Sequence, residues 1–158
     1  MASVYTDLAT SQLAARTDYS QAPNTKQYGG TLRFLQAQKT AYTAATANPL
    51  YVCRLPKGAR LIPQLCSIDY GDPGDACTGK IGYFSAGDTP AALDDDAYTT
   101  SLALGSSAGR IAFDGGTEGA AFLTPVQFSQ DVWIVCTWTT VTNGVSHTQT
   151  WNIAYTVD

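Results

Sequence analysis

The strongest constraint on the fold lies near the C-terminus. Residues 131–141 are rich in β-branched and aromatic side chains, and their alternation gives an extended chain two apolar rows on opposite faces. Asn143-Gly144 follows, which is the preferred dipeptide of a type I′ turn, and residues 149–156 alternate again through Trp151, Ile153 and Tyr155. We therefore predict a β-hairpin between 131–141 and 149–156. The pairing register of this hairpin should be well defined, because a slip of one residue would turn the apolar row to the opposite face of the sheet.

Shorter β-like runs precede this hairpin from residue 31 onward. Loops rich in Gly, Pro and Asp separate them, Pro56-Lys57-Gly58-Ala59 reads as a turn, and Pro63 indicates an edge strand or a bulge. No strand–helix alternation is present, so the pattern predicts an all-β fold, an antiparallel β-sandwich or jelly roll. The candidate strands are 31–37, 50–55, 60–68, 79–84, 101–104 and 111–113.

Residues 1–30 are polar and irregular, and we predict an extended N-terminal arm ahead of one domain at 31–158. A short helix over 7–16 is open, and the surroundings of Pro23 favour extended chain. The arm is expected either to dock on a partner or to be a disordered tail. The first eight residues have no basic n-region or apolar h-region, so no signal peptide is predicted. No run approaches the roughly 18 apolar residues that span a membrane.

Composition limits the class of partner. Charged residues make up 14% of the chain against about 25% in typical globular proteins, while 3 Trp, 9 Tyr and 5 Phe argue against disorder. The polar surface is therefore mostly Thr, Ser, Gln and Asn, which suits burial against other protein subunits. A net charge of −4 argues against a nucleic-acid partner. Arg54, Lys57 and Arg60 form the only basic concentration, which we interpret as a solvated loop.

Catalytic residues are not evident. His147 is the only histidine, no GxSxG elbow is present, and an exposed histidine at a strand end is the favoured interpretation. We predict no enzymatic activity. Four cysteines form no CxxC pair and no zinc pattern, so we expect small buried hydrophobes, with one disulfide left open; they are Cys53, Cys66, Cys77 and Cys136.

Three acidic features are candidate cation sites: Asp69–Asp75, Asp94–Asp96 and Asp114–Glu118. None matches an EF-hand, and solvated loops are the favoured interpretation, so no metal or cofactor is predicted. Four tyrosines could form a sugar-binding platform, although core or interface packing is favoured; they are Tyr42, Tyr51, Tyr70 and Tyr98.

The arrangement also has a family resemblance. A Thr- and Ala-rich arm leads into residues 24–33, a strand around Leu55-Pro56-Lys57-Gly58-Ala59-Arg60 follows, and a short strand at 79–84, an acidic loop and a Trp-rich terminal hairpin complete the chain. This resembles the head decoration, or capsid cement, proteins of tailed bacteriophages. The Leu-Pro-Lys-Gly-Ala-Arg segment is the most suggestive part and is not a catalytic signature.

The resemblance implies a β-sandwich or jelly-roll protein on the outside of the virion, assembled in the host cytoplasm. It would bridge neighbouring subunits of the major capsid protein and associate with itself as a homotrimer or homodimer. No catalytic residue is carried over. By position, the acidic loop 94–96 would face outward, and the arm would contact the capsid or be exchanged between subunits. The implied contact residues are Tyr19, Lys26, Gln27, Tyr28 and Arg33.

Two other interpretations of the sequence remain open. Another virion component, such as a tail or fibre adaptor, would share the composition and the fold class. A carbohydrate-binding β-sandwich module would instead require a planar row of exposed aromatic side chains and a cation site, for example at Asp69, Asp72 and Asp75.

Overall fold

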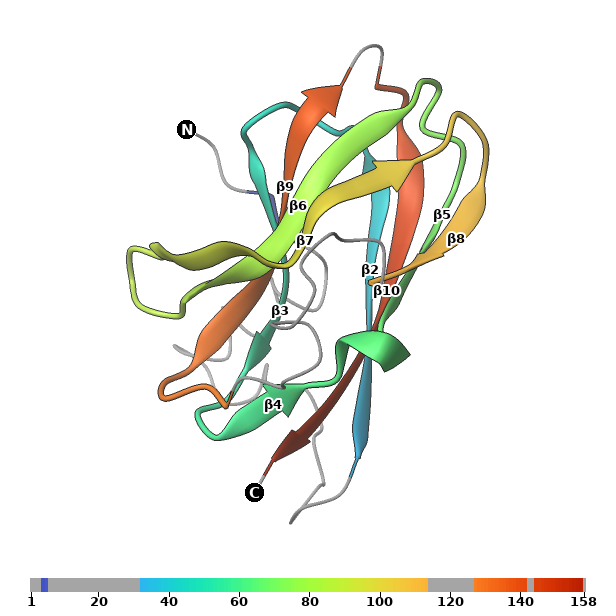
Figure 1. The fold of residues 1–158 in the computed structure, drawn as a ribbon. Helices are drawn as coiled ribbons and strands as arrows, with labels where there is room; N and C mark the ends of the chain where they lie inside the picture. Colours follow the sequence, from blue (N-terminus) through green and yellow to red (C-terminus); the bar gives the residue numbers. More distant parts are fainter. Residues whose placement is uncertain (1–3, 6–31, 114–126, 142–143, 158) are drawn as a thin grey trace.

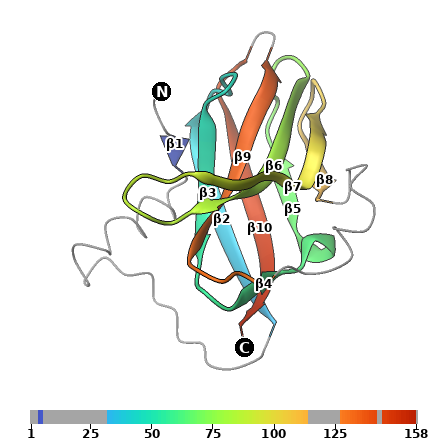
Figure 2. The ribbon, with the colours of Figure 1, turned by 60° about the vertical axis from the view of Figure 1, so that its left-hand side comes forward.

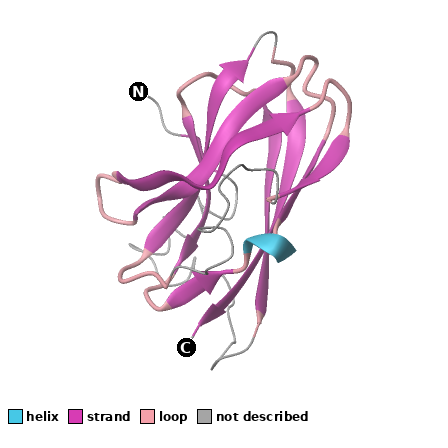
Figure 3. Ribbon diagram, in the orientation of Figure 1, coloured by secondary structure: helices cyan, strands magenta, loops and turns pink. Residues whose placement is uncertain are grey.

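A computed structural model of the chain describes residues 4–5, 32–113, 127–141 and 144–157. Two β-sheets pack face to face in this part of the chain, and the one helical turn among these residues is a short 3-10 helix, Pro63–Leu65 (η2) (Figure 3). No helix of the described residues is long and apolar enough to cross a membrane. The predicted all-β sandwich is confirmed.

Sheet A has the strand order β1-β3-β9-β6-β7 and sheet B the order β2-β10-β5-β8, with β4 paired to the end of β10 (Figure 1, Figure 2). Among these strands, all pairs are antiparallel except β1–β3. Sheet A comprises Val4–Tyr5 (β1), Pro49–Leu55 (β3), Val132–Val141 (β9), Cys77–Ser85 (β6) and Ala92–Leu104 (β7). Sheet B comprises Arg33–Tyr42 (β2), His147–Val157 (β10), Ser67–Tyr70 (β5) and Gly109–Ala112 (β8), and β4 is Ala59–Leu61.

The predicted terminal hairpin is wrong, although both of its strands exist. β9 pairs with β3 and β6 in sheet A, whereas β10 pairs with β2 and β5 in sheet B. The physical reason is that β9 is buried on both faces: Trp138 lies in the core between the sheets, and Trp133 lies in a second cluster with Tyr51. A strand with two apolar faces is most stable in the middle of a sheet, and β9 occupies that position.

Gly144 has a packing role in place of the predicted turn role. A Cβ on Gly144 would lie 3.1 Å from the Ala44 carbonyl oxygen and 3.2 Å from a methyl carbon of Val141. The glycine therefore allows the chain that leaves β9 to pass close to the connection between β2 and β3 on its way to sheet B.

The predicted strand 60–68 is divided in two. Pro63 begins η2 at a first-turn position, where its missing N–H leaves no hydrogen bond unmade, and the helical turn separates β4 from β5. The predicted turn at 56–59 is confirmed, with Gly58 at φ +85°. Asp94–Asp96 lies within β7 and not in a loop, because β7 begins at Ala92 and continues to Leu104.

The N-terminal arm is described only at β1, which pairs with β3 at the edge of sheet A in the register Val4↔Leu50 and Tyr5↔Tyr51. The candidate helix at 7–16 and the segment around Pro23 lie outside the described residues. The boundary at residue 30 stays a prediction.

Candidate interaction surface

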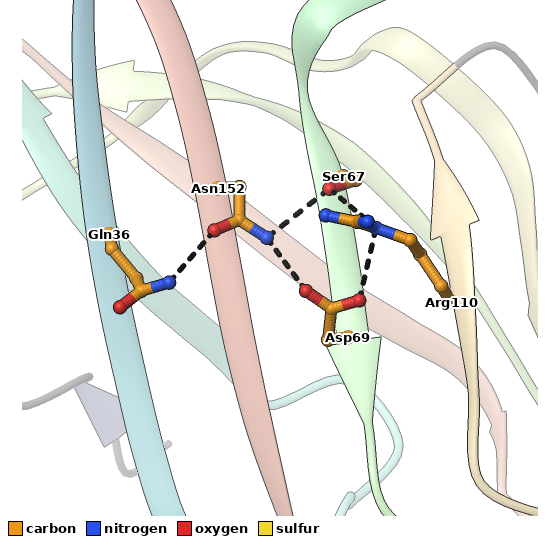
Figure 4. A network of polar contacts seen from close by, with 5 residues as sticks. All are labelled: Gln36, Ser67, Asp69, Arg110 and Asn152. Carbon is orange, nitrogen blue, oxygen red and sulfur yellow. Dashed lines mark hydrogen bonds and ion pairs between the residues drawn. The ribbon is translucent and has the colours of Figure 1, made fainter.

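A ladder of polar side chains crosses the outer face of sheet B from β2 to β8 (Figure 4). The Gln36 amide donates to Asn152 Oδ1 (3.1 Å), and the Asn152 amide donates to Asp69 Oδ2 (2.8 Å) and Ser67 Oγ (3.2 Å). Arg110 Nε lies 3.0 Å from Asp69 Oδ1. The cross-strand register places these groups opposite one another, with Asn152 between Gln36 and Ser67 and with Asp69 opposite Arg110.

The outer face of sheet B is close to neutral. Asp69 is offset by Arg110, and a second rung joins the Gln38 amide to Thr150 Oγ1 at 3.2 Å. Phe34, on the same face of β2 as Gln36, is 61% exposed and lies opposite Ala154 of β10. A polar, nearly neutral surface with a large exposed aromatic side chain suits contact with another protein better than contact with a phosphate backbone.

Arg33 is the one implied contact residue that the structure describes. It begins β2 opposite Tyr155, is half-buried, and alternates with Phe34, so it shares a strand face with Leu35 and Ala37. β2 is an edge strand of sheet B. A charged side chain that points inward at such an edge opposes pairing with a strand of another molecule. The other four, Tyr19, Lys26, Gln27 and Tyr28, lie outside the described residues.

His147 is buried and not exposed, which corrects the prediction. Its side chain is 6% exposed, its ring packs edge-on against Tyr42, and its Nδ1 lies 2.9 Å from the Val145 carbonyl oxygen. Nε2 lies 2.9 Å from the amide nitrogen of buried Gln149. Nδ1–H therefore donates to the carbonyl and Nε2 accepts from the amide, so both ring nitrogens hold structural bonds.

The described carboxylates of the candidate cation sites make structural contacts within the chain. Asp69 belongs to the ladder, and Asp72 Oδ1 accepts from the Gly74 N–H at 2.7 Å, which is the bond of an Asx turn. Asp95 forms an ion pair with Lys80 across β6 and β7. Among the described residues no three His, Cys, Asp or Glu side chains gather around a common point. Asp114–Glu118 lies outside those residues.

The candidate sugar platform is not assembled, because its tyrosines are dispersed and mostly internal. Tyr42, Tyr51 and Tyr98 are each less than 5% exposed, and the Tyr70 hydroxyl accepts a hydrogen bond from the Gly105 N–H (3.1 Å). The expected core packing is confirmed for the first three. These rings pack into the sandwich or onto sheet A and leave no planar row of the four for a pyranose face.

The four cysteines are free thiols and are buried, as predicted. Burial raises the pKa of Cys66 to about 12, against a smaller opposing effect of its backbone hydrogen bond to Ala154. Burial likewise raises the pKa of Cys53 and Cys136. Protonated thiols are poor nucleophiles and poor metal ligands, so these side chains act as packing groups.

The β6–β7 hairpin projects from sheet A beyond the body of the sandwich (Figure 2). Its ladder has three register shifts, and the largest places Ile81 opposite Thr99 but Tyr83 opposite Asp94. At Gly82 the backbones cross closely, since a Cβ there would lie 2.1 Å from the Asp94 carbonyl oxygen. The sequence pattern predicted a loop at Asp94–Asp96 and did not predict this hairpin, although a glycine within a strand pattern indicates a close approach of two backbones.

Charge is unevenly distributed along this hairpin. Lys80, its only basic residue, is paired with Asp95. Burial raises the pKa of Asp94, and the side chain of Asp96 and the charge of Asp95 act in the same direction, while the Asp96 backbone N–H opposes them. Burial and the Asp94 charge also raise the pKa of Tyr83, which lies opposite it.

Comparison with solved structures finds the same fold in a virus capsid. A chain from the capsid of Ralstonia phage GP4 superposes with a TM-score of 0.71 at 16% identity, over 99% of this chain and 99% of that chain. Chains from the cyanophage Pam1 capsid (0.49, 15%, 87% and 92%) and the Helicobacter pylori bacteriophage KHP30 capsid (0.46, 12%, 82% and 90%) superpose less closely. No protein-family model and no curated protein matches the sequence. At 16% identity, the likeness to the chain from the Ralstonia phage GP4 capsid establishes a shared fold.

Proposed function

We propose that this chain is a structural, non-enzymatic protein of a tailed-phage virion. In this proposal it binds the outer surface of the capsid and cements neighbouring subunits of the major capsid protein. It works as a homo-oligomer and assembles in the host cytoplasm. The proposal needs no cofactor, metal, nucleic acid or membrane.

One observation carries the proposal: the superposition on the Ralstonia phage GP4 capsid chain covers 99% of each chain. The likeness therefore extends over the whole architecture, with similar chain lengths, and is not a shared sandwich core with unrelated additions. The sequence resemblance to head decoration proteins, drawn from the arm and the Leu55–Arg60 segment, points to the same class independently.

Surface chemistry supports the proposal. The polar groups of the ladder on the outer face of sheet B are held in internal hydrogen bonds and one ion pair. Burying this face against another protein therefore leaves few polar groups without a partner and has a low desolvation cost. A protein that binds an assembled shell but not free subunits stabilises that shell by mass action. Many copies on one lattice add avidity without a high affinity at each site.

The arm is the proposed capsid-contacting or subunit-exchanging element, through Tyr19, Lys26, Gln27, Tyr28 and Arg33. Arg33 fits this role less well than the others, because it lies half-buried within β2. Phe34, next to it and 61% exposed, is the better candidate contact at this end of sheet B.

Co-sedimentation with undecorated phage heads tests the proposal. We expect saturable binding at a fixed ratio to capsid subunits, with the bound copies on the outside of the shell in electron micrographs. A variant with Tyr19, Lys26, Gln27 and Tyr28 all changed to alanine should lose binding and keep its unfolding curve. The matched control changes Ser106 and Ser107, which are exposed between β7 and β8, to alanine. Absence of binding by the wild-type protein would refute the proposal.

A tail or fibre adaptor is the remaining alternative, since it would have the same fold and composition. Binding to purified tails and not to heads would favour it. The carbohydrate-binding interpretation is disfavoured, because Tyr42, Tyr51 and Tyr98 are internal.

A further inference from the structure

A small pocket lies between the β6–β7 hairpin and the chain that leads into β9 (Figure 1). The Ala86 N–H donates to the Asp131 carbonyl (3.1 Å) and joins the two segments. The pocket has a volume of about 80 Å³, well below the roughly 300–1,000 Å³ of pockets that hold small-molecule ligands, so it fits one side chain of another protein. Its lining residues are Tyr83, Leu93, Gln127, Phe128, Ser129, Gln130 and Val132.

Aromatic rings form one wall of this pocket. The ring centroid of Tyr83 lies 5.1 Å from that of Phe128 and 6.1 Å from that of buried Tyr98, so its position is fixed by packing. Leu93 also lines the pocket and is 49% exposed. An aromatic wall beside an exposed leucine favours a side chain with a long apolar stem, such as arginine or lysine.

A β-bulge places a carboxylate beside the aromatic wall. In the β6–β7 ladder Phe84 pairs with Ala92 and Tyr83 pairs with Asp94, so Leu93 is an extra residue without a partner. Residues directly opposite one another share a face of an antiparallel pair, which puts Asp94 on the same side as Tyr83. Burial raises the pKa of Tyr83 and the Asp94 charge adds to this effect, so the two side chains lie within electrostatic range.

The negative charge at this pocket is not neutralised within the described part of the chain. Asp94 is exposed and forms no ion pair with any described residue. The neighbouring bases have other partners: Lys80 is paired with Asp95, and Arg60, which does not line the pocket, donates to Gln127 Oε1 (3.2 Å). The pocket therefore combines an aromatic wall and a carboxylate, the two groups that attract a cation.

We propose that this pocket receives an arginine side chain of a neighbouring protein in the shell. The guanidinium group would lie on the Tyr83–Phe128 wall and pair with the Asp94 carboxylate, while its apolar stem contacts Leu93. The inference rests on the proposed function for the owner of the arginine. It adds a second contact, on sheet A, to the one proposed for sheet B and the arm, and a protein that cements two subunits needs contacts with both.

A titration of the full chain with N-acetyl-arginine methylamide tests the pocket without phage heads. NMR signals of Tyr83, Leu93 and Phe128 should shift on addition of this probe. The uncharged analogue N-acetyl-citrulline methylamide, of nearly the same shape, should shift them little. Asp94→Asn should weaken arginine binding about 5-fold or more. Asp88→Asn has the same change in net charge at an exposed position of the hairpin outside the pocket lining, and it should bind the probe as the wild type does.

Co-sedimentation with undecorated phage heads tests the owner of the arginine. Asp94→Asn should raise the half-saturating concentration about 10-fold, as loss of one partner of an interfacial charge pair does. Asp88→Asn should bind heads with the wild-type affinity.

The outcomes separate this inference from the proposed function. Equal shifts with the arginine and citrulline probes, or with the wild type and Asp94→Asn, overturn the pocket. An Asp94→Asn variant that has lost the arginine probe but binds heads as tightly as the wild type overturns the shell protein as the owner. A wild-type protein that binds the arginine probe through Asp94 but does not bind heads leaves the pocket standing and refutes the cement role.

Discussion

At the scale of single residues, Gly82 determines whether the β6–β7 hairpin can adopt its path. A Cβ at this position would lie 2.1 Å from the Asp94 carbonyl oxygen and 2.6 Å from Asp95 Cα, so backbone and not a flexible side chain would have to move. Gly87 lies in the same hairpin with nothing within 4 Å of a built Cβ. The two glycines are thus a matched pair with opposite expected sensitivities.

We expect Gly82→Ala to lower the free energy of unfolding by about 1–3 kcal/mol, the usual cost of overpacking. Gly87→Ala should stay within about 0.5 kcal/mol of the wild type. Urea unfolding followed by tryptophan fluorescence measures both. Equal effects of the two substitutions would show that β7 does not cross β6 at Gly82.

Asp94 gives the protein a predictable dependence on pH. Its folded-state pKa is raised by burial and by Asp95 and Asp96, with Tyr83 opposite, so the folded state holds the proton more tightly than the unfolded state. As pH rises from the ordinary value of about 3.9 through the raised pKa, the unfolded state loses its proton first. The carboxylate therefore costs stability above that window and costs none below it.

Asp94→Asn removes this titration. The free energy of unfolding of the variant, minus that of the wild type, should be constant well below the ordinary carboxyl pKa of about 3.9 and should increase as the pH rises above that value. Urea unfolding at about pH 3 and pH 7, at concentrations where both proteins are monomeric, measures this difference. A difference that decreases with pH would mean that a cation stabilises the carboxylate in the folded state.

At the scale of elements, β9 is a central strand with two buried faces, and this can be tested directly. Trp133 is buried with Tyr51, Val135 and Ala86 on the face of sheet A that is turned away from the main core. Its ring lies 5.9 Å from that of Tyr51, edge to face. A terminal hairpin with one solvated face would leave such a residue in water.

Trp133→Ala should therefore lower the free energy of unfolding by about 3–5 kcal/mol, as truncation of a core aromatic does. Thr140→Ala, at an exposed position of the same strand, should change it by less than about 0.5 kcal/mol. Thermal and urea unfolding of the two variants give the comparison. A loss below about 1 kcal/mol for Trp133→Ala would place its side chain in solvent.

The same strand shows how far the sequence could predict the elements. Its β-branched and aromatic run identified β9, and alternation identified β10, because both are local properties. Their pairing was not local. Asn143-Gly144 favours a hairpin, but the second apolar row of β9 is satisfied only by neighbours on both sides, and those neighbours are β3 and β6, far away in sequence.

The candidate surfaces were less predictable than the strands. The polar ladder joins side chains from four strands, and Gln36 and Asn152 are 116 residues apart, so no spacing in the sequence signals it. His147 looked exposed beside a Gly turn, yet its burial depends on Tyr42 and Gln149. Tyr42, Tyr51 and Tyr98 were correctly expected to pack internally, because hydrophobic area alone favours that location.

At the scale of the whole molecule, the two sheets of the described part of the chain differ in what their outward faces carry. The outer face of sheet B carries the polar ladder and the exposed Phe34 and, with the arm, is proposed to meet the shell. Sheet A instead buries Trp133 and Tyr51 on its outward side and carries the projecting β6–β7 hairpin. A shell contact made through sheet B would therefore leave the hairpin of sheet A uncovered.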